Sequence, residues 1–317
     1  MRSPRTRPPS RLGALAPALA ATLALSSCAT RISVSEPADP AASLPREALV
    51  YILAGRPVLE EAAAALLAPA DLKAVRSLLT RTDRVTAALV LPPDGSGLDG
   101  SGASGTESGA GSSRRADLFG IAEGTYPAGA ASFRLRLSRD WRKEGRALVR
   151  RDGKLRIAFA GRHLLAAGTS DLDPLLDRLA DPGPGPLPWD LLPDRDSPGA
   201  LWIPRPGELA GRIWGAEAPA PPARGLLLAL SPGGTEGGYT GTWIFAFDSD
   251  RDARVYAPLC RLAHLAFIRA VHGPGGEAAA SAALERTVWT AEGGLVRASG
   301  FPLSVSSLLR ALDGFLP

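Results

Sequence analysis

The sequence predicts an α+β protein built from two tandem, similar modules. Each is expected to be ferredoxin-like, with an antiparallel sheet covered on one face by helices. The order strand, helix, strand, strand, helix, hairpin, helix occurs twice, and a proline-rich segment separates the two occurrences. A single α/β domain with one continuous sheet is the main alternative.

The first module is expected at residues 46–180. Apolar runs with β-branched residues predict strands over 49–55, 84–92, 117–124, 147–153, 155–161 and 163–168. Helical spacing predicts helices over 59–67, 70–79 and 173–180. Phe133, Leu137 and Trp141 stand at i, i+4 and i+8, which predicts one face of a further helix within residues 129–144.

The Gly/Ser-rich stretch 94–113 is glycine-rich in the manner of a phosphate loop. It has no lysine, however, and it leads into a predicted strand rather than a helix. We therefore expect a flexible loop between two strands.

Residues 181–198 contain six prolines, too many for a helix or a central strand, and are expected to be a linker. The second module follows at residues 199–317. Its strands are expected at 200–204, 225–232 and 241–250, with a hairpin at 287–300 that turns at Gly293 and Gly294. Its helices are expected at 207–215, 253–271 and 304–316, with Pro258 in the first turn of the long one.

The first 28 residues have the parts of a secretory signal. Four arginines and no acidic residue precede the apolar segment 12–25, and Leu25-Ser26-Ser27-Cys28 closes it. A run of about 14 apolar residues is shorter than the roughly 20 that span a bilayer. The segment is therefore expected to be a signal core and not a transmembrane helix.

This pattern resembles the precursor of a bacterial lipoprotein, over residues 1–28 only. The resemblance implies cleavage before Cys28, a diacylglyceryl group on its thiol, acylation of its amine, and anchoring in a membrane of the cell envelope. Ala29 after the cysteine implies the outer membrane rather than the inner one, where an organism has both. Residues 28–45 would be the lipidated cysteine and a flexible tether. A cleaved signal with an incidental Cys28 is the alternative.

The charge balance does not indicate a nucleic-acid partner. The chain has 36 Lys plus Arg against 32 Asp plus Glu, and removal of the four signal arginines leaves 32 against 32. A neutral mature chain without a basic stripe and interleaved aromatic residues lacks the footprint of a nucleic-acid-binding protein.

Histidine and cysteine are scarce. If Cys28 is acylated, Cys260 is the remaining cysteine and no intramolecular disulfide can form. Cys260 and His264 would share one face of a helix, but a zinc site needs three or four ligands, so a buried thiol and a core histidine are expected. No metal, cofactor or catalytic residue is predicted. His163, at a hairpin turn, is the one candidate for a hydrolase, provided that a carboxylate or hydroxyl lies beside it.

Three other groups of residues invite a functional interpretation. Asp248, Asp250 and Asp252 alternate like calcium ligands, but Ala253 replaces the required glycine, so an acidic turn that caps a helix is expected. Glu60 and Glu61 are expected to be solvated on a helix face. Trp202, Trp243 and Trp289 fall in predicted strands of the second module, where core packing is the default and an aromatic binding platform the alternative.

The function that these observations favour is a non-catalytic, membrane-anchored envelope lipoprotein that binds another envelope component, most simply a protein. Two alternatives remain: a lipoprotein that binds a small molecule or lipid in a cleft between the modules, and a hydrolase of envelope polymers.

Overall fold

A computed structural model describes residues 39–91, 116–194, 196–209, 222–233, 238–273 and 275–315. Cys28 and the Gly/Ser-rich stretch 94–113 therefore lie outside the described residues, as does most of the helix expected at 207–215. No helix within the described ranges is long and apolar enough to cross a membrane.

The strands of the first half are β1 (Val50–Gly55), β2 (Thr82–Val90), β3 (Asp117–Gly124), β4 (Trp141–Glu144), β5 (Ala147–Arg150), β6 (Arg156–Phe159) and β7 (Leu164–Gly168). Those of the second half are β8 (Gly199–Ile203), β9 (Gly225–Pro232), β10 (Tyr239–Ala246), β11 (Val288–Glu292) and β12 (Leu295–Leu303). The helices are η1 (Pro40–Ser43), α2 (Arg56–Leu66), α3 (Pro69–Leu79), α4 (Ala128–Leu137), α5 (Asp173–Ala180), α7 (Asp250–His272), α8 (Glu277–Arg286) and α9 (Val305–Phe315).

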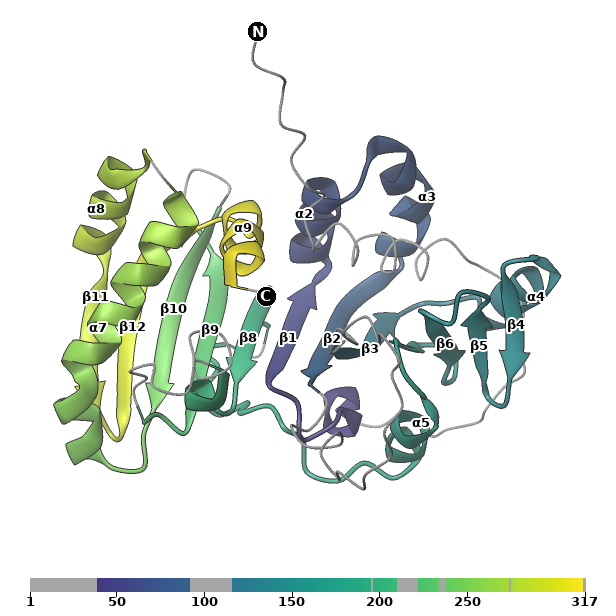
Figure 1. Cartoon of the computed structure of the whole chain (residues 1–317), viewed down its shortest axis with the longest axis horizontal. Helices are drawn as coiled ribbons and strands as arrows, with labels where there is room; N and C mark the ends of the chain where they lie inside the picture. Colours follow the sequence, from purple (N-terminus) through teal and green to yellow (C-terminus); the bar gives the residue numbers. More distant parts are fainter. Residues whose placement is uncertain are drawn as a thin grey trace, which may run out of the picture.

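One antiparallel sheet runs through both halves, in the order β11-β12-β10-β9-β8-β1-β2-β3-β7-β6-β5-β4 (Figure 1). The α+β class is therefore confirmed. The tandem ferredoxin-like modules are not, because β1 and β2 pair directly and antiparallel although α2 and α3 connect them. A split βαβ unit would instead place them parallel, on either side of a third strand.

The halves repeat a pairing order even so. Three consecutive strands pair in sequence in each half, β1-β2-β3 and β8-β9-β10, and a strand from farther along the chain then pairs with the third, β7 or β12. The first strands of the two series, β1 and β8, pair antiparallel from Tyr51↔Trp202 to Ala54↔Gly199. The halves therefore meet through main-chain hydrogen bonds inside one sheet.

The two faces of the sheet carry different covers. Side chains alternate between faces along a strand, so Leu228 and Phe245 join one buried cluster while Leu227 and Ile244 join the other. Helices α7, α8 and α9, with α2 and α3, cover the first face, and Figure 1 shows α7 lying over β10 and β12. The second face is covered by α5, η1 and part of the proline-rich connector.

The tether was expected to extend over residues 28–45, but its last residues are folded. Pro40 to Ser43 form the buried helix η1, and Leu44 is fully buried. The Asp39 carboxylate accepts a hydrogen bond from Trp189 Nε1 at 2.8 Å, which joins η1 to the connector. Residues 39–45 thus belong to the folded body. The proline-rich connector packs on this body as well.

Three helix expectations are corrected. Helix α4 ends at Leu137 and Trp141 begins β4, so the predicted face of Phe133, Leu137 and Trp141 does not exist. Helix α7 begins at Asp250, which places Pro258 in its interior, on the exposed side. The sequence interpretation missed α8, an alanine-rich helix with a small hydrophobic stripe.

Candidate functional site

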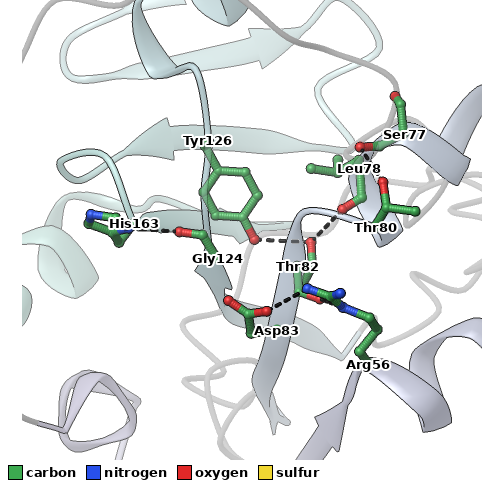
Figure 2. Close-up of polar contacts among 9 residues, drawn as sticks. All are labelled: Arg56, Ser77, Leu78, Thr80, Thr82, Asp83, Gly124, Tyr126 and His163. Atoms are coloured by element: carbon green, nitrogen blue, oxygen red, sulfur yellow. Dashed lines mark hydrogen bonds and ion pairs between the residues drawn. The ribbon is translucent and has the colours of Figure 1, made fainter.

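A buried polar cluster joins α3 to the start of β2 and the end of β3 (Figure 2). The Tyr126 and Thr82 hydroxyls lie 3.0 Å apart, and the Thr82 hydroxyl donates to Leu78 O at 2.9 Å. Burial raises the pKa of Tyr126 to about 12, although the hydrogen bond to Thr82 opposes this rise. The Tyr126 phenol therefore stays protonated and is not an activated nucleophile. The cluster links α3, β2 and β3 by hydrogen bonds.

His163 lies beside this cluster but contacts the main chain. Its Nδ1 is 3.1 Å from Gly124 O, so this nitrogen carries the proton and donates it (Figure 2). Within the described residues its side chain has no carboxylate or hydroxyl partner. The hydrolase hypothesis based on His163 required such a partner, and this geometry does not supply one.

Cys260 and His264 do share a face of α7, and both are buried. Burial raises the pKa of the Cys260 thiol to about 12 and lowers the pKa of His264 to about 4. The His264 ring meets Trp289 and Phe301 edge to face, at centroid distances of 5.3 and 4.7 Å. No three His, Cys, Asp or Glu side chains gather as a metal-binding group in the part of the chain that the structure describes.

The acidic turn before α7 is a helix cap, as expected. The Ser249 hydroxyl accepts a hydrogen bond from the Asp252 amide at 3.1 Å and donates one to the Asp252 carboxylate at 2.6 Å. Asp250 pairs with Arg254 one turn later, at 2.7 Å. The carboxylates are therefore engaged with the helix that follows them.

The three tryptophans do not form one platform. Trp202 and Trp243 are buried in the clusters on opposite faces of the sheet. Trp289 is half-buried and lies beneath the Arg261 guanidinium, whose carbon is 5.5 Å from the ring centroid. The core interpretation holds for the first two, and the third packs from β11 against α7.

Glu61 has a role that no local pattern signals. Its carboxylate accepts a hydrogen bond from the Val305 amide at 3.0 Å, at the N-terminus of α9. Because the partner is 244 residues away, the sequence shows only a glutamate on a helix. The expectation that Glu61 is merely solvated is wrong, since it links the two halves.

Two large hydrophobic side chains of α4 are exposed to solvent. Phe133 is 57% exposed and Leu137 is 69% exposed, one helical turn apart. Leu135 is fully buried, so α4 packs through its opposite side. Strand β4 contacts α4 and, among the described strands, lies at the edge of the sheet and pairs with β5 alone.

A pocket of about 620 Å³ lies in the second half, where the ends of α7 and α8, the end of β12 and the first turns of α9 converge. Its polar lining comprises Tyr239, Thr240, His272, Arg286, Ser304, Ser307 and Arg310. Burial, and then the nearby Glu61 carboxylate, raise the pKa of Tyr239, so this phenol is a neutral donor.

The fold resembles one that has been solved by crystallography. Crystal form I of TP0453 aligns over 89% of this chain and 99% of its own length, with 15% sequence identity and a TM-score of 0.55. Crystal form III aligns over 88% and 99%, with 13% identity and a TM-score of 0.54. No protein-family model and no curated protein matches the sequence. The likeness therefore concerns the fold alone.

Proposed function

We propose that the chain is a non-catalytic envelope lipoprotein, held at a membrane through lipid on Cys28, whose folded body binds another envelope component. The lipobox supports the anchor, and the exposed pair Phe133 and Leu137 on α4 supports the binding role. Large apolar side chains more than half exposed and one turn apart are typical of a contact surface rather than of a solvated helix.

The surroundings of this pair favour a protein partner. The open edge of β4 can accept a further strand, and Arg139, Arg142 and Lys143 beside it are all exposed. Arg142 is paired with Glu144 at 2.6 Å, which leaves Arg139 and Lys143 as the cations most accessible to a partner. A partner that presents an apolar side chain flanked by carboxylates would complement this surface.

The buried state of the reactive groups supports a non-catalytic role. The Cys260 thiol is held protonated by burial, and His163 donates to a main-chain carbonyl. The alternative of a ligand in a cleft between modules gains no support, because β1 and β8 pair directly where the halves meet.

Crosslinking in the native membrane tests the partner surface. Aspartate at both Phe133 and Leu137 should remove most of the adduct with the partner, since loss of an interface hot spot costs roughly 30-fold in affinity. The matched control places aspartate at Val255 and Leu262, which are 61% and 62% exposed on α7 at the other end of the sheet. An adduct that survives the α4 substitutions, or that disappears equally with the control, would contradict the proposal.

The anchor has a separate test. The mature protein from its native membrane should carry a lipid mass increment that is absent from a Cys28→Ala form. An unmodified mass would remove the lipoprotein part of the proposal and leave the α4 surface to be judged by crosslinking.

A further inference from the structure

We infer that the pocket between α7, α8, α9 and the end of β12 binds a small soluble molecule that carries a phosphate or carboxylate group. The pocket belongs to the second half, whereas the proposed partner surface is on α4 of the first half. The two sites are therefore independent in position and in chemistry.

The charge of the pocket is positive. Arg286 enters it from the end of α8 and Arg310 from α9. Over the described residues neither guanidinium has an ion-pair partner, and no acidic side chain lines the pocket. Two unpaired guanidinium groups around one hollow match an oxyanion, which arginine binds through paired N–H donors.

The N-terminus of α9 adds to this potential. Ser304 and Ser307 cap the helix reciprocally: the Ser307 amide donates to the Ser304 hydroxyl at 3.1 Å, and the Ser304 amide donates to the Ser307 hydroxyl at 3.2 Å. Both residues line the pocket, so the positive end of the helix dipole lies at its wall. Glu61 binds the Val305 amide and offsets part of this field, but it is not among the lining residues.

His272 is a half-buried residue at the wall of the pocket. It is the last residue of α7 and lines the pocket, and its Nε2 is buried without a hydrogen-bond partner among the described residues. A buried polar atom that lacks a partner is costly, so such atoms in native proteins are usually satisfied by water or a ligand. Because this nitrogen has almost no accessible surface, an internal water fits it better than a ligand in the open pocket.

The size and walls of the pocket restrict the ligand. A volume of about 620 Å³ lies in the range of small-molecule sites and exceeds what an inorganic anion needs. The aliphatic lining is limited to Val271, Pro302 and Leu303, which is too little to enclose an acyl chain. The geometry thus fits a compact polar molecule with one anionic group better than a lipid.

Titration of the mature chain with inorganic phosphate, followed by calorimetry at low chloride, tests the inference. Arg286→Gln and Arg310→Gln should each weaken binding roughly tenfold or more, because each removes a charge-assisted hydrogen bond. Arg251→Gln is the matched control: it is an exposed arginine near the other end of α7, about 30 Å from His272 along the helix. Thermal melting without phosphate should be the same for all three variants.

Binding weaker than about 1 mM, or equal weakening by Arg251→Gln, would overturn the inference. So would an unchanged affinity in both pocket variants. In the NMR spectrum the ring signals of His272 should shift at saturating phosphate, and those of His163 should not; the reverse would place the ion elsewhere. Vesicles of phosphatidylglycerol should leave phosphate binding unchanged, and competition by them would refute a soluble ligand.

Discussion

The two halves of the sheet share a pairing order but are covered in different ways. In the second half the long helix α7 lies over β10, β11 and β12, and α8 and α9 pack against it. In the first half α2 and α3 pack on the same face, against β1 and β2, and the short α5 lies on the other face with η1 and the connector. With the same strand order, the described helices of the second half thus cover one face, whereas those of the first half are divided between both faces.

This difference has a consequence for the two ends of the sheet. At the β11 end Trp289 lies under α7, where its ring contacts His264 and Arg261. At the β4 end α4 packs inward through Leu135 and leaves its own Phe133 and Leu137 exposed. The β4 end thus combines an apolar pair one helical turn apart with an edge strand, and we place the partner surface there.

The largest expected effect tests whether the halves unfold together. Ile268 on α7 and Leu176 on α5 are 0% and 1% exposed, and alanine at either should cost about 2–5 kcal/mol of unfolding free energy. Because β1 and β8 pair within one sheet, both variants should show a single calorimetric transition at a lower temperature. Two separate transitions in either variant would mean that the halves are independent domains.

A pH effect is expected from His264 in the second half. Burial lowers the pKa of His264 to about 4, below its unfolded value near 6.5, so the unfolded state binds more protons between these values. Stability contributed by the neutral ring is fully present above about pH 6.5 and is lost as the pH falls toward 4, by up to about 3 kcal/mol.

Urea unfolding at pH 7 and pH 4.5 measures this loss. His264→Phe should reduce the pH dependence of the unfolding free energy, since a neutral ring replaces a titrating one. His163→Gln, in the exposed turn of the first half, should leave that pH dependence unchanged. An equal slope in the wild type and in His264→Phe would show that other groups carry the acid response.

The smallest effect compares one glycine in each half. Gly241 in β10 lies under the buried Phe301 ring, where an added Cβ would come within 2.1 Å of a ring carbon. Gly120 occupies the corresponding strand β3, and its nearest atom would be 3.8 Å away. Gly241→Ala should cost about 1–3 kcal/mol through overpacking, whereas Gly120→Ala should be neutral or slightly stabilising. Equal urea midpoints would show that Phe301 can move aside.

Much of the element order could be predicted from the sequence. Short runs such as 225–232 are apolar on both faces because the strands are buried on both faces, and hairpin residues Gly293 and Gly294 adopt φ of 61° and 76°. Local pattern failed at α4, where Phe133 and Leu137 imitate the buried face of a helix. It also failed at α8, because an alanine-rich segment presents little hydrophobic contrast.

The candidate sites were less accessible to sequence reasoning. The residues of the pocket come from β10, α7, α8, β12 and α9, and no motif unites Arg286, Arg310 and His272. The caps at Ser249 and Ser304 are local signals, but the direction in which a pocket opens depends on how helices pack.

The sequence by itself predicted a signal with a lipobox and a neutral balance after its removal, and it determined the α+β class and the capping of α7, because each of these depends on neighbouring residues or on composition. Only the tertiary structure decided that β1 pairs with β8, that Glu61 binds α9, and that Phe133 faces outward. Strand pairing and helix packing join residues that are far apart in the chain. A local sequence pattern therefore does not indicate which distant segment will cover a given side chain.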